Sequence, residues 1–427
     1  MTIAQSLPWI HPLDAAATIS DPYWVLLYSG MQTSYSGRYS YLARELIDTI
    51  KANNFDAFAA RLTHNTSPFE NCWFGYLGYG LKDSLEKLTA DQPNWFALPP
   101  LYMMQFSTIY QFDHHARTLT AYSNQPAIIP LGTEKKGILP TPHITTLNSN
   151  MTTPEYLEKV AYVLERIHAG DLYQANLTRK FYGAFENTPD AFSIFHTLCT
   201  ISPAPYSAFL SMGKTFVISS SPEQFLSIDA SGNVSSRPIK GTASRSEDAE
   251  QDMKLCAQLA NSEKDRAENL MIVDLMRNDI ARSCAPGSVT VDSLFDVTTH
   301  ATIHHMSSTI RGCKRPDQSV LDIVKHCFPP GSMTGAPKIK AMNLCSQLER
   351  VERGIYSGAI GWFGGDGSAE LSVVIRTLLL NGNRFEFQVG GGVVADSTPV
   401  QEWQELLAKA KGIGKTLGLD AARLEAA

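Results

Sequence analysis

The sequence predicts one large folded unit of the α+β class, in which antiparallel strands and helices are mixed. Its 427 residues are 44% hydrophobic, which is enough for a substantial core. Strand-like runs occur near both ends of the chain, and those near the C-terminus are joined by glycine-rich and Asn-Gly turns. Amphipathic helices with start signals occur from residue 153 onward. These observations predict sheet and helix within one unit.

Composition and charge exclude several classes of function. The 36 basic and 42 acidic side chains give a net charge of −6, so the chain has no general attraction for nucleic acid. No apolar run approaches the roughly 20 residues needed to span a bilayer. Residues 1–20 lack the pattern of a signal peptide, so we expect a cytoplasmic protein. The seven scattered cysteines have no Cys-x-x-Cys spacing and are expected to be buried free thiols.

The chain is expected to have three parts. Residues 1–123 form an N-terminal subdomain that is mainly sheet, with strands such as Trp24–Tyr28 and one amphipathic helix over Tyr41–Ile50. Residues 124–152 are rich in Pro, Thr and Asn, have no hydrophobic period, and are predicted to be a linker. Residues 153–427 form the third part, which holds the candidate chemistry.

Four helices are predicted in the third part. They begin near Thr153, Glu247, Glu263 and Pro399. Ser262 before the third helix and Thr398 before the fourth are typical N-caps. Near the C-terminus an antiparallel meander is predicted, with strands over Tyr356–Phe363, Leu371–Leu380 and Arg384–Val389.

The turn Arg237–Thr242 holds Lys240 between a proline and a glycine. To act as a nucleophile, this amine must lose its proton near neutrality, so it must be desolvated or lie beside other cations. A Pro-Ile-Lys-Gly segment taken alone is also compatible with an exposed loop lysine. Lys240 is therefore a candidate nucleophile whose surroundings decide its role.

Two predicted helices carry acids three residues apart, Asp265 with Glu268 and Glu402 with Glu405. This spacing puts both carboxylates of a pair on one helical face. A single pair of this kind is usually a solvated surface feature. Two pairs, each near the start of a capped helix, indicate a site where carboxylates hold Mg²⁺ and an anionic substrate completes the shell. The sequence does not establish that the two helices face each other.

Further features suit an anion. Gly390–Gly392 is expected to end a strand where bare N–H groups approach a ligand, or else to be a flexible turn. Gly331–Lys338 is a glycine-rich turn without the ending of a nucleotide P-loop. Arg376 is expected inside an apolar strand, where it needs either an internal carboxylate or a substrate. His305, beside His304, is either a hydrogen-bonded core residue or a ligand.

Ordered segments from about residue 155 to the end resemble the chorismate-utilising enzymes. The segments that carry the resemblance are 170–176, 219–223, 264–271, 331–338, 375–377 and 390–397. The resemblance implies two large antiparallel β-sheets packed as a sandwich with surrounding helices, like anthranilate synthase component I. Both parts of the chain would contribute strands, so independent domains are not expected.

The resemblance also implies a reaction. Members that add water to chorismate carry a lysine base where this chain has Gln174, and an amide cannot take the proton of water. Anthranilate synthases carry alanine where this chain has Lys240. The chain is therefore similar to members that aminate chorismate at C4, giving 4-amino-4-deoxychorismate. Lys240 would attack C2 as the 4-hydroxyl departs, Glu223 would give acid–base help, and ammonia would then expel the lysine.

The resemblance implies Mg²⁺ as the cofactor, with Glu268 and Glu405 as the closest ligands and Asp265 and Glu402 as outer acids. The residues expected to contact substrate are Gln174, Thr242, His305, Thr334, Tyr356, Arg376, Gly390, Gly391, Gly392 and Lys409. Ammonia is expected from a glutamine amidotransferase subunit, because the chain has no convincing nucleophile elbow for glutamine hydrolysis.

Two alternatives stay open. The first is anthranilate synthase component I with Lys240 as a bystander, and the second is a catalytically silent partner that keeps the chorismate pocket. Tryptophan-inhibited anthranilate synthases carry Leu-Glu-Ser near the start, whereas this chain has Leu27-Tyr28-Ser29. Inhibition by tryptophan is therefore not expected.

Overall fold

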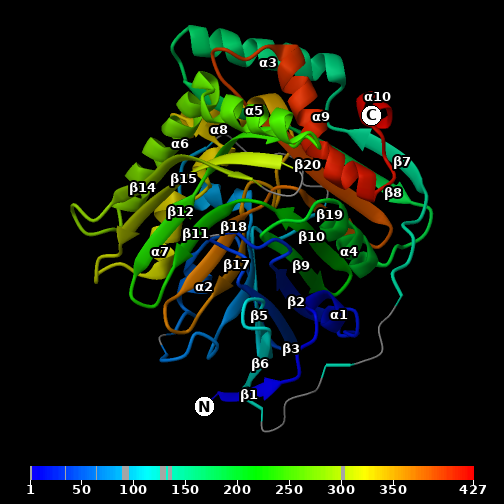
Figure 1. Cartoon of the computed structure of the whole chain (residues 1–427), viewed down its shortest axis with the longest axis vertical. Coiled ribbons are helices and arrows are strands. Elements are labelled where there is room, and N and C mark those ends of the chain that lie inside the picture. Colours follow the sequence, from blue (N-terminus) through cyan, green and yellow to red (C-terminus); the bar gives the residue numbers. More distant parts are fainter. Residues whose placement is uncertain are drawn as a thin grey trace.

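The computed structural model describes residues 2–33, 35–63, 65–88, 96–125, 131–132, 137–299 and 303–427. Within these residues, 20 strands are joined by hydrogen bonds into one antiparallel sheet, which comprises two halves. Helices α3, α5, α8 and α9 gather at one end of the molecule and the N-terminus lies at the opposite end (Figure 1).

The first half of the sheet joins strands from both ends of the chain. Its order is β7 (Ile144–Ser149), β8 (Gln174–Phe185), β20 (Arg384–Val393), β19 (Thr377–Asn381), β10 (Thr215–Ser221), β9 (Tyr206–Met212), β2 (Tyr23–Tyr28) and β3 (Tyr39–Ala52).

The second half has the order β4 (Trp73–Leu77), β17 (Ala359–Phe363), β18 (Ala369–Val373), β11 (Gln224–Ile228), β12 (Asn233–Arg237) and β15 (Ile303–Cys313), and β15 also pairs with β13 (Ile239–Ser244) and β14 (Thr290–Thr299). The long strand β5 (Leu101–Asp113) pairs with both β3 and β4 and so connects the two halves. Three short strands complete the sheet, namely β1 (Ile3–Leu7), β6 (Thr118–Ser123) and β16 (Gly335–Ala336).

Helices cover the outer faces of both halves. Those packed on the first half are α1 (Pro12–Ala16), α3 (Thr153–His168), α4 (Ala191–Ile201), α8 (Lys338–Glu349), α9 (Pro399–Thr416) and α10 (Ala421–Ala426). Those on the second half are α2 (Asp56–Ala59), α5 (Ala249–Ala260), α6 (Glu263–Ala281) and α7 (Val320–Cys327). Two 3₁₀ helices, η1 (Tyr79–Ser84) and η2 (Gly331–Met333), lie in connections.

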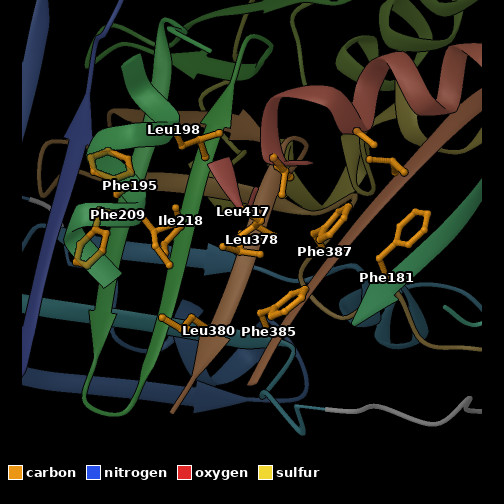
Figure 2. Packing of buried hydrophobic residues seen from close by; sticks show 14 of the residues in the cluster. Phe181, Phe195, Leu198, Phe209, Ile218, Leu378, Leu380, Phe385, Phe387 and Leu417 are labelled. Atoms are coloured by element: carbon orange, nitrogen blue, oxygen red, sulfur yellow. The ribbon is translucent and has the colours of Figure 1, made fainter. Parts of the chain in front are cut away.

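Three apolar clusters hold these layers together. One lies between the first half of the sheet and its helices, and Figure 2 shows Phe181, Phe195 and Phe387 among its side chains. A second lies under α2, α6 and α7. The third contains residues of both halves, such as Val25 from β2 and Trp362 from β17, and so fills the space between them. The molecule is therefore a four-layer sandwich, as predicted.

Several sequence predictions need correction. The helix predicted over Tyr41–Ile50 is wrong, because these residues belong to β3, which pairs with β5 and is bent by a register shift after Leu46. The predicted linker 124–152 includes β7, which pairs with β8, and residues 126–130 and 133–136 lie outside the described residues. The strand predicted over Leu371–Leu380 is divided into β18 and β19.

Other predictions are confirmed. The helix of Glu263–Ala281 begins at the predicted residue, and the Ser262 side chain accepts a hydrogen bond from the Asp265 backbone N–H. Thr398 caps α9 in the same way. All seven cysteines are free, but Cys256 is only partly buried and Cys313 is exposed, so the expectation of burial is wrong for these two. Among the described residues, no helix combines the length and apolarity that a membrane span requires.

Candidate active site

Lys240 lies where the register between β13 and β15 shifts, between Ile239 and Thr242. Gly241 follows with φ +84°, a left-handed conformation that glycine adopts without strain, so the pair forms a bulge that turns the lysine out of the ladder. A Cβ placed on Gly392 would lie 3.3 Å from Lys240 Nζ. The amine therefore points from β13 at the end of β20. These two strands are distant in sequence.

Glu223 is a buried carboxyl in the connection between β10 and β11. Burial raises its pKa from 4.5 to about 6, although hydrogen bonds from the Ser332 hydroxyl and the Ile239 backbone N–H and the charge of Lys240 act in the opposite direction. A carboxyl with this pKa exchanges a proton near neutrality. Glu223 therefore has the environment of an acid–base group beside Lys240.

Glu268 on α6 and Glu405 on α9 are close enough to influence each other. Burial raises the pKa of Glu268, and the nearby charges of Glu405 and Asp265 add to this, while Lys240 and Lys264 oppose it. The Lys409 ammonium, 2.6 Å from Glu405 Oε1, lowers the pKa of Glu405. The helices α6 and α9 thus present their acids to one site, which the sequence alone left undecided.

The two outer acids approach this site from different sides. Asp265 lies against the lysine turn, because a Cβ placed on Gly241 would lie 3.0 Å from Asp265 Cβ. Glu402 is buried, with Oε1 accepting a hydrogen bond from the Ser397 hydroxyl at 2.6 Å and Oε2 without a partner among the described residues. A Cβ on Gly391 would lie 2.7 Å from that free oxygen, so Glu402 abuts the back of β20. Burial raises the pKa of Glu402.

These acids fit a magnesium ion only in part. Among the described residues, no three His, Cys, Asp or Glu side chains are arranged as a complete metal site. Mg²⁺, however, is commonly held by one or two carboxylates, with water and an anionic substrate completing the shell. The facing carboxylates of Glu268 and Glu405, with the unpartnered Glu402 oxygen behind β20, meet that smaller requirement.

Gly390–Gly392 lies inside β20 rather than after it, which corrects the prediction that the glycines follow the strand. Each is paired with β8, opposite Thr178, Leu177 and Asn176. The Gly390 carbonyl accepts a hydrogen bond from Lys409 Nζ at 3.1 Å, so Gly390 directs its backbone groups away from β8. Because this direction alternates along a strand, Gly392 has the same orientation and its N–H faces the site.

The prediction that Arg376 lies inside a strand is wrong. Arg376 lies in the bend between β18 and β19, with φ +50°. Burial lowers the pKa of its guanidinium, and the charge of Glu223 opposes this. Within the described part of the chain, no carboxylate lies within 4 Å of this guanidinium. Because the charge of Glu223 still acts on Arg376, the choice between an internal carboxylate and a substrate carboxylate stays a prediction.

Gln174, at the start of β8, is buried beside Gly392, because a Cβ on that glycine would clash with Gln174 Nε2. Gln174 Oε1 has no partner among the described residues. The Tyr356 ring is buried, and burial raises the pKa of its hydroxyl, with a further contribution from Glu223. Thr334 is buried next to the same strand, but its hydroxyl donates to the Gly331 carbonyl at 3.2 Å.

Thr242 and His305 form a separate pair on neighbouring strands. The Thr242 hydroxyl lies 3.0 Å from His305 Nδ1, and His305 is buried while Thr242 is exposed. Lys338, at the end of the second glycine-rich turn, donates to Asp279 at 2.6 Å and to the carbonyls of Cys327 and Pro329. Its role is structural, in keeping with the absence of a P-loop ending.

Sequence reasoning missed two side chains at the site. Ser332 donates its hydroxyl to Glu223. Lys264 Nζ lies 3.9 Å from Glu268 Oε1 and also lowers the pKa of Glu402. Both stand inside segments that resemble the chorismate-utilising enzymes, and that position was the only available signal.

A cavity of about 170 Å³ lies apart from Lys240, between β2, β3, β9 and β17. The segment Leu27–Ser29 lines it, as does Glu370, whose burial raises the pKa of its carboxyl. Tyr28 and Glu370 therefore line one cavity.

Comparison with known proteins decides the family. A model of the chorismate binding enzymes matches residues 18–415. The chain belongs to this family. Aminodeoxychorismate synthase component 1 of Escherichia coli is 38% identical over 362 residues, which cover 84% of this chain and 79% of that protein. Aminodeoxychorismate synthase of Streptomyces griseus is 46% identical over 255 residues, 60% of this chain, and the match covers only 35% of that longer protein.

A solved structure in the family has the same fold. Anthranilate synthase component I from Streptococcus pneumoniae superposes with a TM-score of 0.78 at 27% identity, covering 89% of this chain and 93% of that chain. The predicted fold, a large antiparallel sandwich with surrounding helices, is therefore confirmed.

Proposed function

We propose that this protein is the chorismate-aminating component of an aminodeoxychorismate synthase, which converts chorismate and ammonia to 4-amino-4-deoxychorismate for p-aminobenzoate and folate synthesis. The observation that carries the proposal is the placement of Lys240 beside Gly392 and within the field of Glu223, Glu268 and Glu405. A nucleophile, a proton donor and anion-binding groups are thus gathered at the end of one strand.

Lys240 is the proposed nucleophile. Its neutral amine attacks C2 of chorismate, both ring double bonds shift, and the 4-hydroxyl leaves as water with a proton from the carboxyl of Glu223. Ammonia then attacks C4, the two double bonds shift back, and the C2–N bond breaks to release the neutral lysine amine. The Glu223 carboxylate takes back a proton from the new C4 ammonium. Two displacements of this kind place the nitrogen of ammonia on C4, the carbon that lost the hydroxyl. This outcome explains the need for a covalent intermediate.

The substrate is a dicarboxylate, and the site offers matching donors. Arg376 has a buried guanidinium without a carboxylate partner among the described residues, and the Gly392 N–H faces the same space. Charge-assisted hydrogen bonds of this kind orient a carboxylate strongly. Tyr356 and Gln174 supply neutral polar groups beside the substrate ring. The exposed Thr242 is hydrogen-bonded to His305 and supports that side of the site from outside.

For Mg²⁺ we propose Glu268 and Glu405 as ligands, with Asp265 and Glu402 behind them. The ion, when bound, would supply positive charge next to a substrate carboxylate. Lys409, which pairs with Glu405 and the Gly390 carbonyl, would keep the Glu405 carboxylate in place as the second ligand. A glutamine amidotransferase subunit in the cytoplasm would supply the ammonia, as the name component 1 of the E. coli relative suggests for a multi-part enzyme.

The decisive experiment compares wild type with Lys240→Ala. In the absence of ammonia, wild-type protein mixed with chorismate and Mg²⁺ is expected to gain a covalent adduct that maps to Lys240 in intact-mass and peptide analysis. Lys240→Ala is expected to lose the adduct and at least a thousandfold of the amination rate, while chorismate binding changes less than threefold. Lys214→Ala, on the turn between β9 and β10 at the end of β10 remote from Glu223, is the matched control.

The same assay separates the anthranilate alternative, which the similarity to a solved anthranilate synthase component I keeps in view. Anthranilate is fluorescent and is formed with release of pyruvate, whereas aminodeoxychorismate keeps the enolpyruvyl group. Pyruvate release by the wild type, or a full amination rate in Lys240→Ala, would contradict the proposal. The complete absence of turnover with ammonium would favour the silent partner.

A further inference from the structure

A row of polar side chains runs through the interior between β8 and β20. Residues that face each other across these strands share one face of the sheet, and the register places Gln388 opposite Lys180 and Gly392 opposite Asn176. The buried members of the row are Gln174, Asn176, Thr178 and Lys180 from β8 and Glu386 and Gln388 from β20. Such a row is unusual in a sandwich interior, where apolar side chains normally meet.

The end of this row borders a small cavity of about 10 Å³, with Tyr356 and Thr377 among its other lining residues. Two buried oxygen atoms from the row, Glu386 Oε2 and Gln388 Oε1, have no hydrogen-bond partner within the described residues. A cavity of this size holds one small molecule, about as large as water. Buried acceptors without a donor are rare in folded proteins, so the pair indicates a ligand.

The other atoms of these two side chains are already engaged. Glu386 Oε1 accepts a hydrogen bond from Lys180 Nζ at 3.2 Å, and Gln388 Nε2 donates to the Thr178 hydroxyl at 2.6 Å. Both partners are themselves buried. Burial raises the pKa of Glu386, and the charge of Lys180 opposes this. With that carboxylate ionised, both oxygens can only accept, so a molecule that binds between them must donate hydrogen bonds.

Two of the cavity's lining residues, Tyr356 and Gln388, show where it lies relative to the proposed reaction site. Tyr356 lines the cavity and lies within the electrostatic field of Glu223. Gln388 precedes Gly392 by four residues on the same face of β20, a separation of about 13 Å in an extended strand. Gly392 in turn abuts Lys240, and the side chains of Thr178 and Gln174 line the face of the sheet between the cavity and that glycine.

We propose that this cavity is a binding site for ammonia, which donates hydrogen bonds to Glu386 Oε2 and Gln388 Oε1 before it enters the reaction site. Ammonia is about as large as water, which the cavity can hold, and it has three N–H donors for the two acceptor oxygens of the cavity. The Lys180–Glu386 ion pair balances the buried charge, so the site accepts a neutral molecule. The inference rests on the proposed function, because only an amination needs ammonia at Lys240.

The test is the substitution Gln388→Met, which removes one acceptor at similar volume. With ammonium as the nitrogen source, the KM for ammonium is expected to rise at least tenfold. The rate of adduct formation at Lys240 without ammonia and the Kd of chorismate are expected to stay within twofold of wild type. Gln5→Met, on the exposed strand β1, is the control for the same side-chain change.

A second variant controls for the possibility that Gln388→Met disturbs the local structure. Leu379→Phe fills the cavity from β19, opposite Glu386, without removing either acceptor, and it must raise the KM for ammonium in the same way. An unchanged KM in both folded variants would mean that the cavity holds a structural water only and would overturn the proposal. A wild type that forms no adduct would refute the proposed function, and the ammonia site would fall with it.

Discussion

At the scale of single residues, Glu223 is the group whose environment is best matched to its proposed task. Its carboxyl is buried, yet it keeps hydrogen bonds from Ser332 and the Ile239 backbone, which fix its orientation. A pKa of about 6 leaves part of the population protonated near neutrality, as proton donation to a leaving hydroxyl requires.

The raised pKa of Glu223 predicts a pH-dependent stability. The native state holds this proton more tightly than the unfolded chain, so the stabilisation is fully present below pH 4.5 and is lost as the pH rises through about 6. We expect the free energy of unfolding of wild type to fall relative to Glu223→Gln by about 2 kcal/mol over this interval. Urea unfolding of both proteins between pH 4 and 8 measures the difference, and parallel curves would contradict the raised pKa.

The residues of the site could be predicted from the sequence where a chemical type and a spacing coincide. Lys240 stands out because of its turn, and the acid pairs because of their helical spacing. Ser332 and Lys264 could not be found this way, because a serine in a turn and a lysine on a helix are ordinary until their partners are known. The free oxygen of Glu402 likewise depends on its contact with Gly391, which only tertiary structure supplies.

At the scale of elements, the bend between β18 and β19 places Arg376 in a strained backbone conformation that directs its side chain to the site. Arg376 occupies a left-handed conformation at φ +50°, which is unfavourable for any residue with a Cβ. The bend turns a guanidinium out of the ladder and toward Glu223. Strand propensity alone would have continued the apolar run, and this is why the sequence predicted an unbroken strand.

Two substitutions separate the roles of this bend. Arg376→Ala and Arg376→Gly both remove the guanidinium, so each is expected to weaken chorismate binding at least tenfold. Glycine also relieves the backbone strain, so Arg376→Gly is expected to be more stable than Arg376→Ala by about 1 kcal/mol. Calorimetric binding and chemical denaturation measure the two effects, and equal stability of the variants would refute the strain.

Helix starts were predictable because a cap is local. Ser262 and Thr398 each satisfy a backbone N–H three residues ahead, and no distant contact is needed to recognise them. The segment Tyr41–Ile50 was predicted incorrectly because its apolar residues recur at helical spacing, whereas pairing with β5 along almost the whole strand determines its structure. Pairing of strands far apart in sequence leaves no comparable local signal.

At the scale of the whole molecule, a buried ion pair connects α8 with the first half of the sheet. Arg353 Nη2 lies 2.6 Å from Glu349 Oε1, and both side chains are almost fully buried. The guanidinium also donates to the carbonyls of Asn176 and Met333, and Glu349 accepts from the Thr178 N–H. This network holds η2, and with it Ser332, against β8.

A double-mutant cycle tests this connection. Glu349→Leu leaves the Arg353 charge uncompensated in the interior and is expected to cost about 3 to 5 kcal/mol of unfolding free energy. The pair Glu349→Leu with Arg353→Met is expected to cost clearly less than the sum of its single substitutions, because neither charge is then left alone. Denaturant unfolding of the four proteins supplies the cycle, and additive losses would show that the two charges do not interact.

The strand order also has a consequence for how the chain is made. The middle of the first half of the sheet, between β10 and β8, is filled by β19 and β20, which are synthesised last among the strands. While the ribosome is still translating, β8 and β10 expose unpaired edges, which are sites of aggregation. The first half of the sheet therefore cannot close until Val393 has left the ribosome.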